Sequence, residues 1–263
     1  MLWIEKYRPN DFEGILGQDH VVTHLKNAAL SGNVPHLLLT GPAGTGKSVS
    51  VECLARLLYG DRMDENLTTI QIADLFEQGK KYLESDERYT HLYRREQSLL
   101  ANFKNIIRWY ASIRPLDSEF RIIVFEGASA MTREAQQGIR RIMERYSITC
   151  RFIFVTSRPS AIIPAVSSRC LPFFFVPINN DVIGTRLHAI LSSEFGDMPP
   201  LSHDEVDLIV QVAAGDMRKA IMLLQVSSGA GDRSDLVRCS QTETVQIAQA
   251  ALAAVSGGDM QSA

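Results

Sequence analysis

A glycine-rich octapeptide, residues 41–48, constrains the fold of this chain more than any other feature. It follows the apolar run 36–40 and precedes an amphipathic segment that reaches about Tyr59, so the pattern predicts a strand, a tight turn and a helix. In such a turn the backbone N–H groups curl around an anion, and the helix start adds its positive dipole end. The octapeptide predicts a phosphate-binding P-loop, because a purely structural glycine turn, the alternative, does not require Lys47 and Ser48.

The octapeptide also assigns roles to individual side chains. Lys47 would reach the β- and γ-phosphates of a nucleoside triphosphate, and the Ser48 hydroxyl would bind Mg²⁺. The expected phosphate-binding residues are Gly41, Pro42, Ala43, Gly44, Thr45, Gly46, Lys47 and Ser48.

Composition narrows the class of protein further. With 263 residues, 45% of them hydrophobic and 22% charged, the chain has the make-up of a soluble protein of one large or two modest domains. A net charge of -3 argues against a globally basic nucleic-acid binder, so any contact with nucleic acid would need a local basic face.

The cysteines are too far apart for a zinc site, which predicts reduced thiols: Cys53, Cys150, Cys170 and Cys239. No N-terminal signal pattern and no membrane-spanning apolar run is visible, so a cytoplasmic protein without membrane contact is expected.

Short apolar segments alternate with helical ones over the first two thirds of the chain. Strands are expected at 36–40, 67–72, 121–125, 151–156 and 171–176, and helices at 19–30, 46–59, 99–113 and 132–146, with Asp19 and Thr132 as the N-caps of the first and last of these helices. This alternation predicts the α/β class, with a parallel sheet covered on both faces and the phosphate site at the carboxyl ends of the strands. Residues 2–18 are expected to be an extended arm or a packed tail. The charged stretch 77–95 is expected to be a solvated helical face rather than a binding site.

The strand pattern stops after Pro177. Helices are expected at 181–195, 203–214 and 217–226, and a further alanine-rich one at 242–255. The predicted domains are a nucleotide-binding α/β domain at 1–176, a small helical lid at 177–232 and a further helical segment at 233–263.

Several motifs resemble one family in the same order along the chain. They are the segment 2–9 (LWIEKYRP), Gly17 with Gln18, the P-loop, 135–144, 149–153, 168–170 (SRC) and 215–220 (GDMRKA). Together they closely resemble the small subunit of replication factor C, an AAA+ ATPase and sliding-clamp loader. The resemblance implies a pentameric complex with other replication factor C subunits that uses ATP and Mg²⁺ to place a sliding clamp on primer–template DNA. The family's collar domain would begin at 233–263 and is incomplete in this sequence.

The resemblance also implies roles for single residues outside the P-loop. Tyr7, Arg8 and Gly17 match the family's adenine pocket. Arg169 matches an arginine finger that acts on a neighbouring subunit's nucleotide, the alternative being an exposed arginine at a strand start. Arg218 matches the sensor that contacts the γ-phosphate in its own subunit, the alternative being a surface charge.

The second nucleotide motif departs from the family. Glu126 takes the place of the metal-binding Asp and would reach Mg²⁺ through water. Gly127 takes the place of the catalytic Glu and offers no proton acceptor, and Ser157 stands where the family usually has an Asn sensor. These departures predict slow hydrolysis in this chain's own site, unless a neighbouring acid such as Glu134 substitutes.

The DNA-facing helix is hard to align with the family. Possible phosphate contacts are Lys104, Arg108 and Arg133, against the alternative that these charges are merely solvated.

The leading hypothesis for the function is a clamp-loader ATPase subunit. The second is a nucleotide-binding subunit that does not hydrolyse and supplies an arginine finger to its neighbour. A metabolic P-loop kinase explains neither the arginine before the last strand nor the helical lid.

Overall fold

The chain divides into two compact units in the computed structural model, which describes residues 1–115, 117–196 and 198–229. One unit is Arg8–Ile178, and the other joins Met1–Tyr7 to the described residues from Asn179 onward. Met1–Tyr7 therefore groups with the C-terminal helices, whereas the sequence had placed these residues in the α/β domain. The predicted segment 233–263, with its helix at 242–255 and Cys239, lies outside the described residues.

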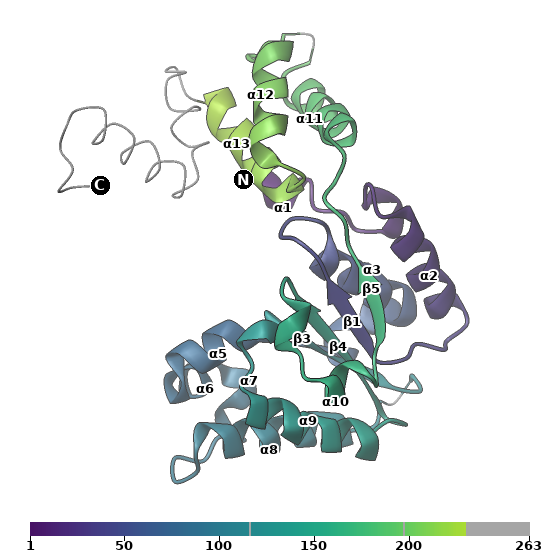
Figure 1. The fold of residues 1–263 in the computed structure, drawn as a ribbon, viewed down its shortest axis with the longest axis vertical. Helices are drawn as coiled ribbons and strands as arrows, with labels where there is room; N and C mark the ends of the chain where they lie inside the picture. Colours follow the sequence, from purple (N-terminus) through teal and green to yellow (C-terminus); the bar gives the residue numbers. More distant parts are fainter. Residues whose placement is uncertain (116, 197, 230–263) are drawn as a thin grey trace, which may run out of the picture. The chain divides into compact units, whose positions relative to one another are not determined.

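The larger unit is built on a parallel sheet, which confirms the predicted class (Figure 1). Within the described chain the sheet has five strands, in the order β2-β3-β4-β1-β5. They are β1 (Leu37–Thr40), β2 (Leu67–Gln71), β3 (Arg121–Glu126), β4 (Cys150–Thr156) and β5 (Leu171–Phe174). Leu39, Val155 and Glu126 share one register line across β1, β4 and β3, so the carboxyl ends of these three strands meet at one edge.

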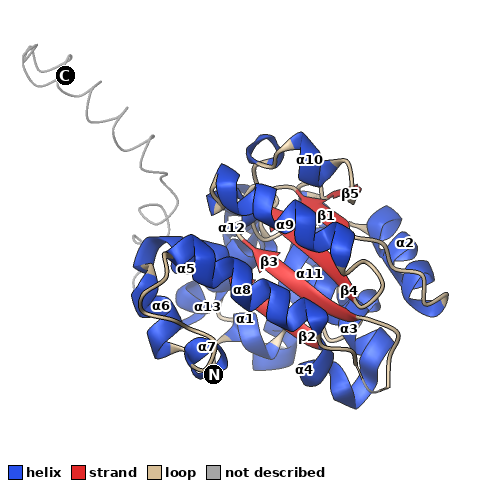
Figure 2. Cartoon of the chain, turned by 90° about the horizontal axis from the view of Figure 1, so that it is seen from below, coloured by secondary structure: helices blue, strands red, loops and turns tan. Residues whose placement is uncertain are grey.

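Helices cover both faces of this sheet (Figure 2). One face carries α5 (Ile72–Gln78), α6 (Lys80–Ser85), α7 (Glu87–Thr90), α8 (Leu99–Ser112) and α9 (Arg133–Arg145), and the other carries α2 (Asp19–Leu30) and α3 (Lys47–Tyr59). Shorter elements are η1 (Phe12–Gly14), η2 (Gly60–Arg62), α4 (Met63–Asn66), η3 (Ala128–Ala130), η4 (Pro159–Ala161) and α10 (Pro164–Ser167).

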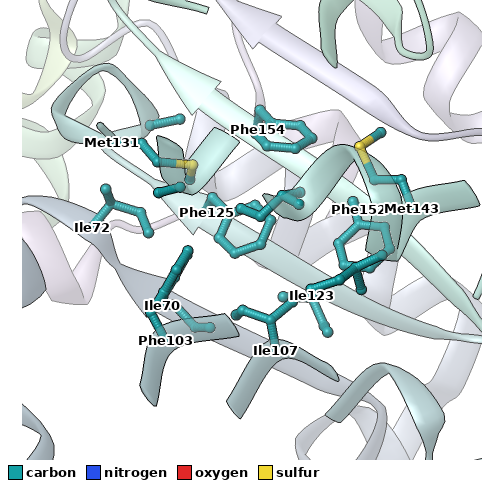
Figure 3. Close-up of a cluster of buried hydrophobic side chains, with 14 of the residues drawn as sticks. Ile70, Ile72, Phe103, Ile107, Ile123, Phe125, Met131, Met143, Phe152 and Phe154 are labelled. Atoms are coloured by element: carbon teal, nitrogen blue, oxygen red, sulfur yellow. The ribbon is translucent and has the colours of Figure 1, made fainter. Parts of the chain in front are cut away.

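Successive strand residues alternate between the two cores, as the period-two geometry of a strand requires. In β3, Phe125 is buried on the α8–α9 face, whereas Val124 is buried on the α2–α3 face. Figure 3 shows the buried cluster on the α8–α9 face, in which Phe125 lies among side chains from β4 and α8, including Phe152 and Phe103. Because both faces are covered, the strands read as continuous apolar runs in the sequence.

The second unit consists of helices. They are α1 (Trp3–Lys6), α11 (Asn180–Phe195), α12 (His203–Ala213) and α13 (Met217–Gly229). The N-terminal segment is tied to them, since the Trp3 backbone N–H donates to Gln225 Oε1 (2.8 Å), and Lys6 Nζ and the Tyr7 hydroxyl both donate to Glu194 Oε1 (2.7 Å each). None of the helices in the described ranges is long and apolar enough to cross a bilayer.

Three expectations about local structure need correction. Residues 2–18 are not simply extended, because the arm contains α1 and η1, whose buried Trp3 and Phe12 pack against their own units. The N-cap of α2 is Gln18, so Asp19 lies in the first helical turn instead. The last strand ends at Phe174 rather than at 176.

The histidine before β1 gives a prediction for the pH dependence of stability. The His36 Nδ1 atom accepts a hydrogen bond from the Phe152 backbone N–H (3.1 Å), so this bond requires that nitrogen to be unprotonated. Burial, with the nearby positive Arg151, lowers the pKa of His36 to about 4 from its ordinary 6.5. The unfolded chain therefore binds a proton more readily than the folded one between these values. We expect the free energy of unfolding to fall by about 2 kcal/mol as the pH drops from 6.5 to 4.

The measurement is the urea midpoint of unfolding at several pH values, for the unmodified protein and for His36→Asn. Asparagine keeps an acceptor for the Phe152 N–H and does not titrate, so the variant should lose this part of the pH dependence. Equal slopes in the two proteins would contradict the assignment to His36.

Candidate functional site

The P-loop connects β1 to α3 at the carboxyl edge of the sheet. Gly41 has a φ of 144°, and a Cβ there would lie 2.3 Å from the Phe175 carbonyl oxygen, so no other residue fits without displacing the backbone. Gly46, the N-cap of α3, has a φ of 96° in the left-handed region. The two glycines allow the turn to be tight, which agrees with the predicted strand, turn and helix.

The start of α3 has the features of an anion site. No side chain caps its N-terminus, and the first N–H groups of a helix have no partner within the helix. The Lys47 ammonium lies against the same loop and donates to the carbonyl oxygens of Gly41 (2.9 Å) and Pro42 (2.5 Å). The Thr45 hydroxyl also donates to Pro42 O (2.9 Å). An uncapped helix start with a lysine beside it fits a phosphate, and Ser48 follows in the first turn of α3.

The residues of the second nucleotide motif lie at the same edge. Glu126 is the last residue of β3, half-buried, and in register with Val155 of β4. Ser157 follows β4 directly and is exposed. The sheet therefore brings the P-loop, Glu126 and Ser157 to the ends of three adjacent strands, and Glu126 and Ser48 would be the residues that hold Mg²⁺ there.

Gly127 has a left-handed backbone, with φ 65° and ψ 37°. A Cβ at this position has room, because the nearest atom, Ala73 Cβ, would be 3.8 Å away. The conformation nevertheless disfavours any residue with a side chain by about 1–2 kcal/mol. The position expected to carry the catalytic Glu therefore has no carboxylate, and its backbone conformation is one that glycine adopts more readily than other residues.

The residues matched to the adenine pocket belong to different units. Arg8 forms a two-point ion pair with Glu52 of α3, through Nη2 (2.5 Å) and Nε (3.0 Å). Gly17 has a φ of 70° and approaches Ile178 closely. Tyr7 is in the helical unit, where its hydroxyl binds Glu194. Sequence reasoning did not anticipate Glu52, because its partner lies 44 positions earlier in the chain.

Arg169 follows α10 and precedes β5, and its side chain is about one third exposed. Its guanidinium donates to Glu144 Oε1 of α9 through Nη2 (2.5 Å) and Nε (3.1 Å). Arg218 is exposed in the first turn of α13, in the helical unit. The roles expected for Arg169 and Arg218 stay predictions.

The predicted DNA contacts lie on two adjacent helices, α8 and α9, which run side by side on one face of the sheet (Figures 1 and 2). The half-buried Lys104 crosses Gly138 of α9, where a Cβ would be 2.3 Å from Lys104 Cε. Arg108 is exposed one turn further along α8, and Arg133 is exposed at the start of α9. The role of these three residues as DNA phosphate contacts stays a prediction.

The fold and the P-loop together define a P-loop protein of the AAA+ class. Among solved structures, two variants of Thermotoga maritima RuvB share this fold, with TM-scores of 0.58 and 0.60, at 16% and 15% identity. In both cases the match covers 89% of this chain and 72% of the RuvB chain. At this identity the likeness shows the fold alone.

Sequence comparisons define the family. The model of the family described as DNA polymerase III, delta subunit matches residues 17–179, and this chain belongs to that clamp-loader family. The replication factor C small subunit of Aeropyrum pernix is 36% identical over 231 residues, which are 88% of this chain and 64% of that protein. The same subunit of Methanoregula boonei is 37% identical, over 85% of this chain and 62% of that protein. The resemblance to replication factor C small subunits is confirmed, and the chain spans somewhat less than two thirds of these relatives.

Proposed function

We propose that this chain is an ATP-binding subunit of a replication factor C complex that helps load a sliding clamp onto primed DNA. The observation that carries the proposal is the P-loop, whose glycine geometry, uncapped helix start and Lys47 fit a triphosphate. Its setting in a clamp-loader family supports the partners: other replication factor C subunits, in a hetero-oligomer that we take to be a pentamer, the clamp and primer–template DNA. The place of action would be the cytoplasm.

The bound nucleotide would supply the phosphoanhydride bond that is hydrolysed, and Mg²⁺ would neutralise part of the charge on its phosphates. The residues of this chain would hold it in place: the P-loop amides and Lys47 bind the phosphates, and Ser48 and Glu126 orient the metal. Arg8 and Gly17, with Tyr7, would receive the base, and Arg218 would contact the γ-phosphate. Ser157 would hold the attacking water in place of the family's usual asparagine.

The experiment is ATP hydrolysis by the assembled complex, measured with and without clamp and primed DNA. We expect the clamp and the primed DNA each to raise the rate of ATP hydrolysis. A complex whose hydrolysis responds to neither, or a chain that does not join the complex, would refute the clamp-loading function. Charge reversal at Lys104, Arg108 and Arg133 in the same assay tests whether these residues carry the DNA response.

Gly127 favours a more specific version, in which this chain binds ATP but hydrolyses it slowly in its own site and supplies Arg169 to a neighbour. A glycine has no group that can accept the proton of the attacking water, and loss of a general base lowers rates by about 10²- to 10⁴-fold. The second hypothesis, a subunit that does not hydrolyse at all, is the limit of this version. Glu134 is exposed in the first turn of α9 and remains the candidate substitute base.

Replacing Gly127 with glutamate is expected to raise single-turnover hydrolysis in this chain's own site by about 10- to 100-fold. This is less than the full worth of a general base, because the left-handed backbone opposes the side chain by about 1–2 kcal/mol. Gly127→Gln is the matched control, since it introduces the same strain and nearly the same shape without a proton acceptor. Equal rates for the glutamate and glutamine variants would contradict the lost-base explanation.

A further inference from the structure

The guanidinium of Arg169 is held by two elements of its own subunit. Its Nε and Nη2 atoms donate to one oxygen of Glu144, at 3.1 and 2.5 Å, and its Nη1 atom donates to the Ala165 carbonyl oxygen at 2.7 Å. The backbone around it is fixed as well, because the Arg169 N–H donates to the Val166 carbonyl oxygen (3.0 Å), and both Val166 and the adjacent Cys170 are buried. The Arg169 side chain therefore has a defined direction although about one third of it is exposed.

These contacts leave part of the guanidinium available. An arginine has five N–H donors, and the contacts to Glu144 and Ala165 account for three of them. A long contact from Nη1 to the Ser168 hydroxyl (3.5 Å) accounts for a fourth. The fifth N–H belongs to Nη2, and together with the weakly held N–H of Nη1 it forms an outer edge that can bind a phosphate. We infer that Glu144 is a positioning residue for Arg169: it binds the inner edge of the guanidinium and thereby aims the outer edge at the nucleotide of a neighbouring subunit. This inference rests on the proposed role of Arg169 as a finger.

The charges around Glu144 are consistent with that role. Its Oε1 atom also accepts from Arg140 Nε (3.3 Å), one turn earlier on α9. The hydrogen bond from Arg169, helped by Arg140, lowers the pKa of Glu144, so the carboxylate stays ionised near neutral pH. Two arginines sharing one carboxylate leave the cluster with a net positive charge. Arg169 can therefore attract a triphosphate while its hydrogen bonds to Glu144 stay intact.

A different outcome follows if Glu144 merely competes with the phosphate. In that case removing the carboxylate would free the arginine and raise the rate at the neighbouring site. The positioning role requires the opposite, because a mobile side chain loses the orientation on which transition-state stabilisation depends. The sign of the effect therefore separates the two arrangements.

The test is ATP hydrolysis by the assembled complex carrying Glu144→Ala, Glu144→Gln or the control Glu119→Ala. Glu119 is an exposed glutamate, so its loss removes the same charge elsewhere on the surface. We expect kcat to fall by about 10- to 100-fold for Glu144→Ala, with the KM for ATP unchanged. Glu144→Gln keeps an acceptor for the inner edge and should recover most of the rate, and Glu119→Ala should match the unmodified complex. An unchanged or raised kcat for Glu144→Ala would overturn the inference, as would a glutamine variant as slow as the alanine one.

The Arg169→Ala background separates this inference from the function on which it rests. If Glu144 acts only through Arg169, adding Glu144→Ala to Arg169→Ala lowers kcat no further. An additional fall in the double variant would contradict positioning. If Arg169→Ala alone leaves kcat unchanged, the proposed role of Arg169 as an arginine finger is wrong. If it lowers kcat while Glu144→Ala does not, only the positioning role fails.

Discussion

Replacing Lys47 with alanine is expected to weaken the binding of Mg·ATP by about 100-fold or more. The ammonium would form charge-assisted hydrogen bonds to two phosphate groups, and a hydrogen bond to a charged group contributes about 1.5–3 kcal/mol. Its present contacts with the carbonyl oxygens of Gly41 and Pro42 place it at the rim of the loop, where those phosphates would lie. Isothermal titration calorimetry with Mg·ATP measures the change directly.

The same contacts mean that Lys47 also supports the loop, so a folded-state control is needed. Lys47→Met keeps most of the aliphatic stem and removes only the charge, and it should weaken binding about as much as alanine does. Lys26→Ala removes an exposed lysine of α2 and should leave the affinity unaltered. Thermal unfolding of each variant shows whether the loop has collapsed. If Lys47→Ala binds Mg·ATP as tightly as the unmodified chain, or if the unmodified chain releases no heat, the nucleotide function is wrong.

Replacing Arg169 with alanine is expected to lower hydrolysis at the neighbouring subunit's site by about 10³-fold or more. An arginine finger supplied in trans neutralises charge that develops on the transferred phosphoryl group, and its contribution is about 10³ to 10⁵ in rate. The affinity of this chain's own site should not change, because a finger acts across the interface. Single-turnover hydrolysis by the assembled complex, together with calorimetry on the separate chain, measures both quantities.

Two further variants sharpen the interpretation. Arg169→Lys keeps the charge but not the planar fork, so it should remain far below the unmodified rate. Arg145→Ala removes an exposed arginine at the end of α9 and should have no effect on hydrolysis. A rate for Arg169→Ala within about two-fold of the Arg145→Ala control would exclude the finger, whatever the behaviour of the P-loop.

The local features of this chain could be predicted well from the sequence. The strand, turn and helix of the P-loop are encoded within about twenty-five consecutive residues. The helices at 99–113 and 132–146 have apolar spacings that match α8 and α9 to within a residue or two. Thr132 was expected as the N-cap of the second of these helices, and its side chain accepts from the Ala135 N–H.

Errors occurred where long-range packing decides the conformation. The segment 2–9 has little periodicity of its own, and α1 forms because Trp3 is buried beside Phe195 of α11 in the helical unit. The charged stretch 77–95 forms parts of three short helices whose charged side chains are mostly exposed, as expected for a solvated helical face. The density of charge concealed only that Leu83 and Tyr89 are buried in the core under α8.

The amino-acid sequence by itself determined the fold class, the family and the location of the P-loop, because glycine spacing and apolar periodicity act over one or two neighbouring elements. Only the tertiary structure decided which carboxylates partner Arg8 and Arg169, that Tyr7 and Arg8 belong to different units, and that Gly127 is left-handed. Those ion pairs join residues 44 and 25 positions apart, and the direction of each side chain depends on the elements packed around it. Short-range patterns carry no information about such contacts until the sheet and its helices have assembled.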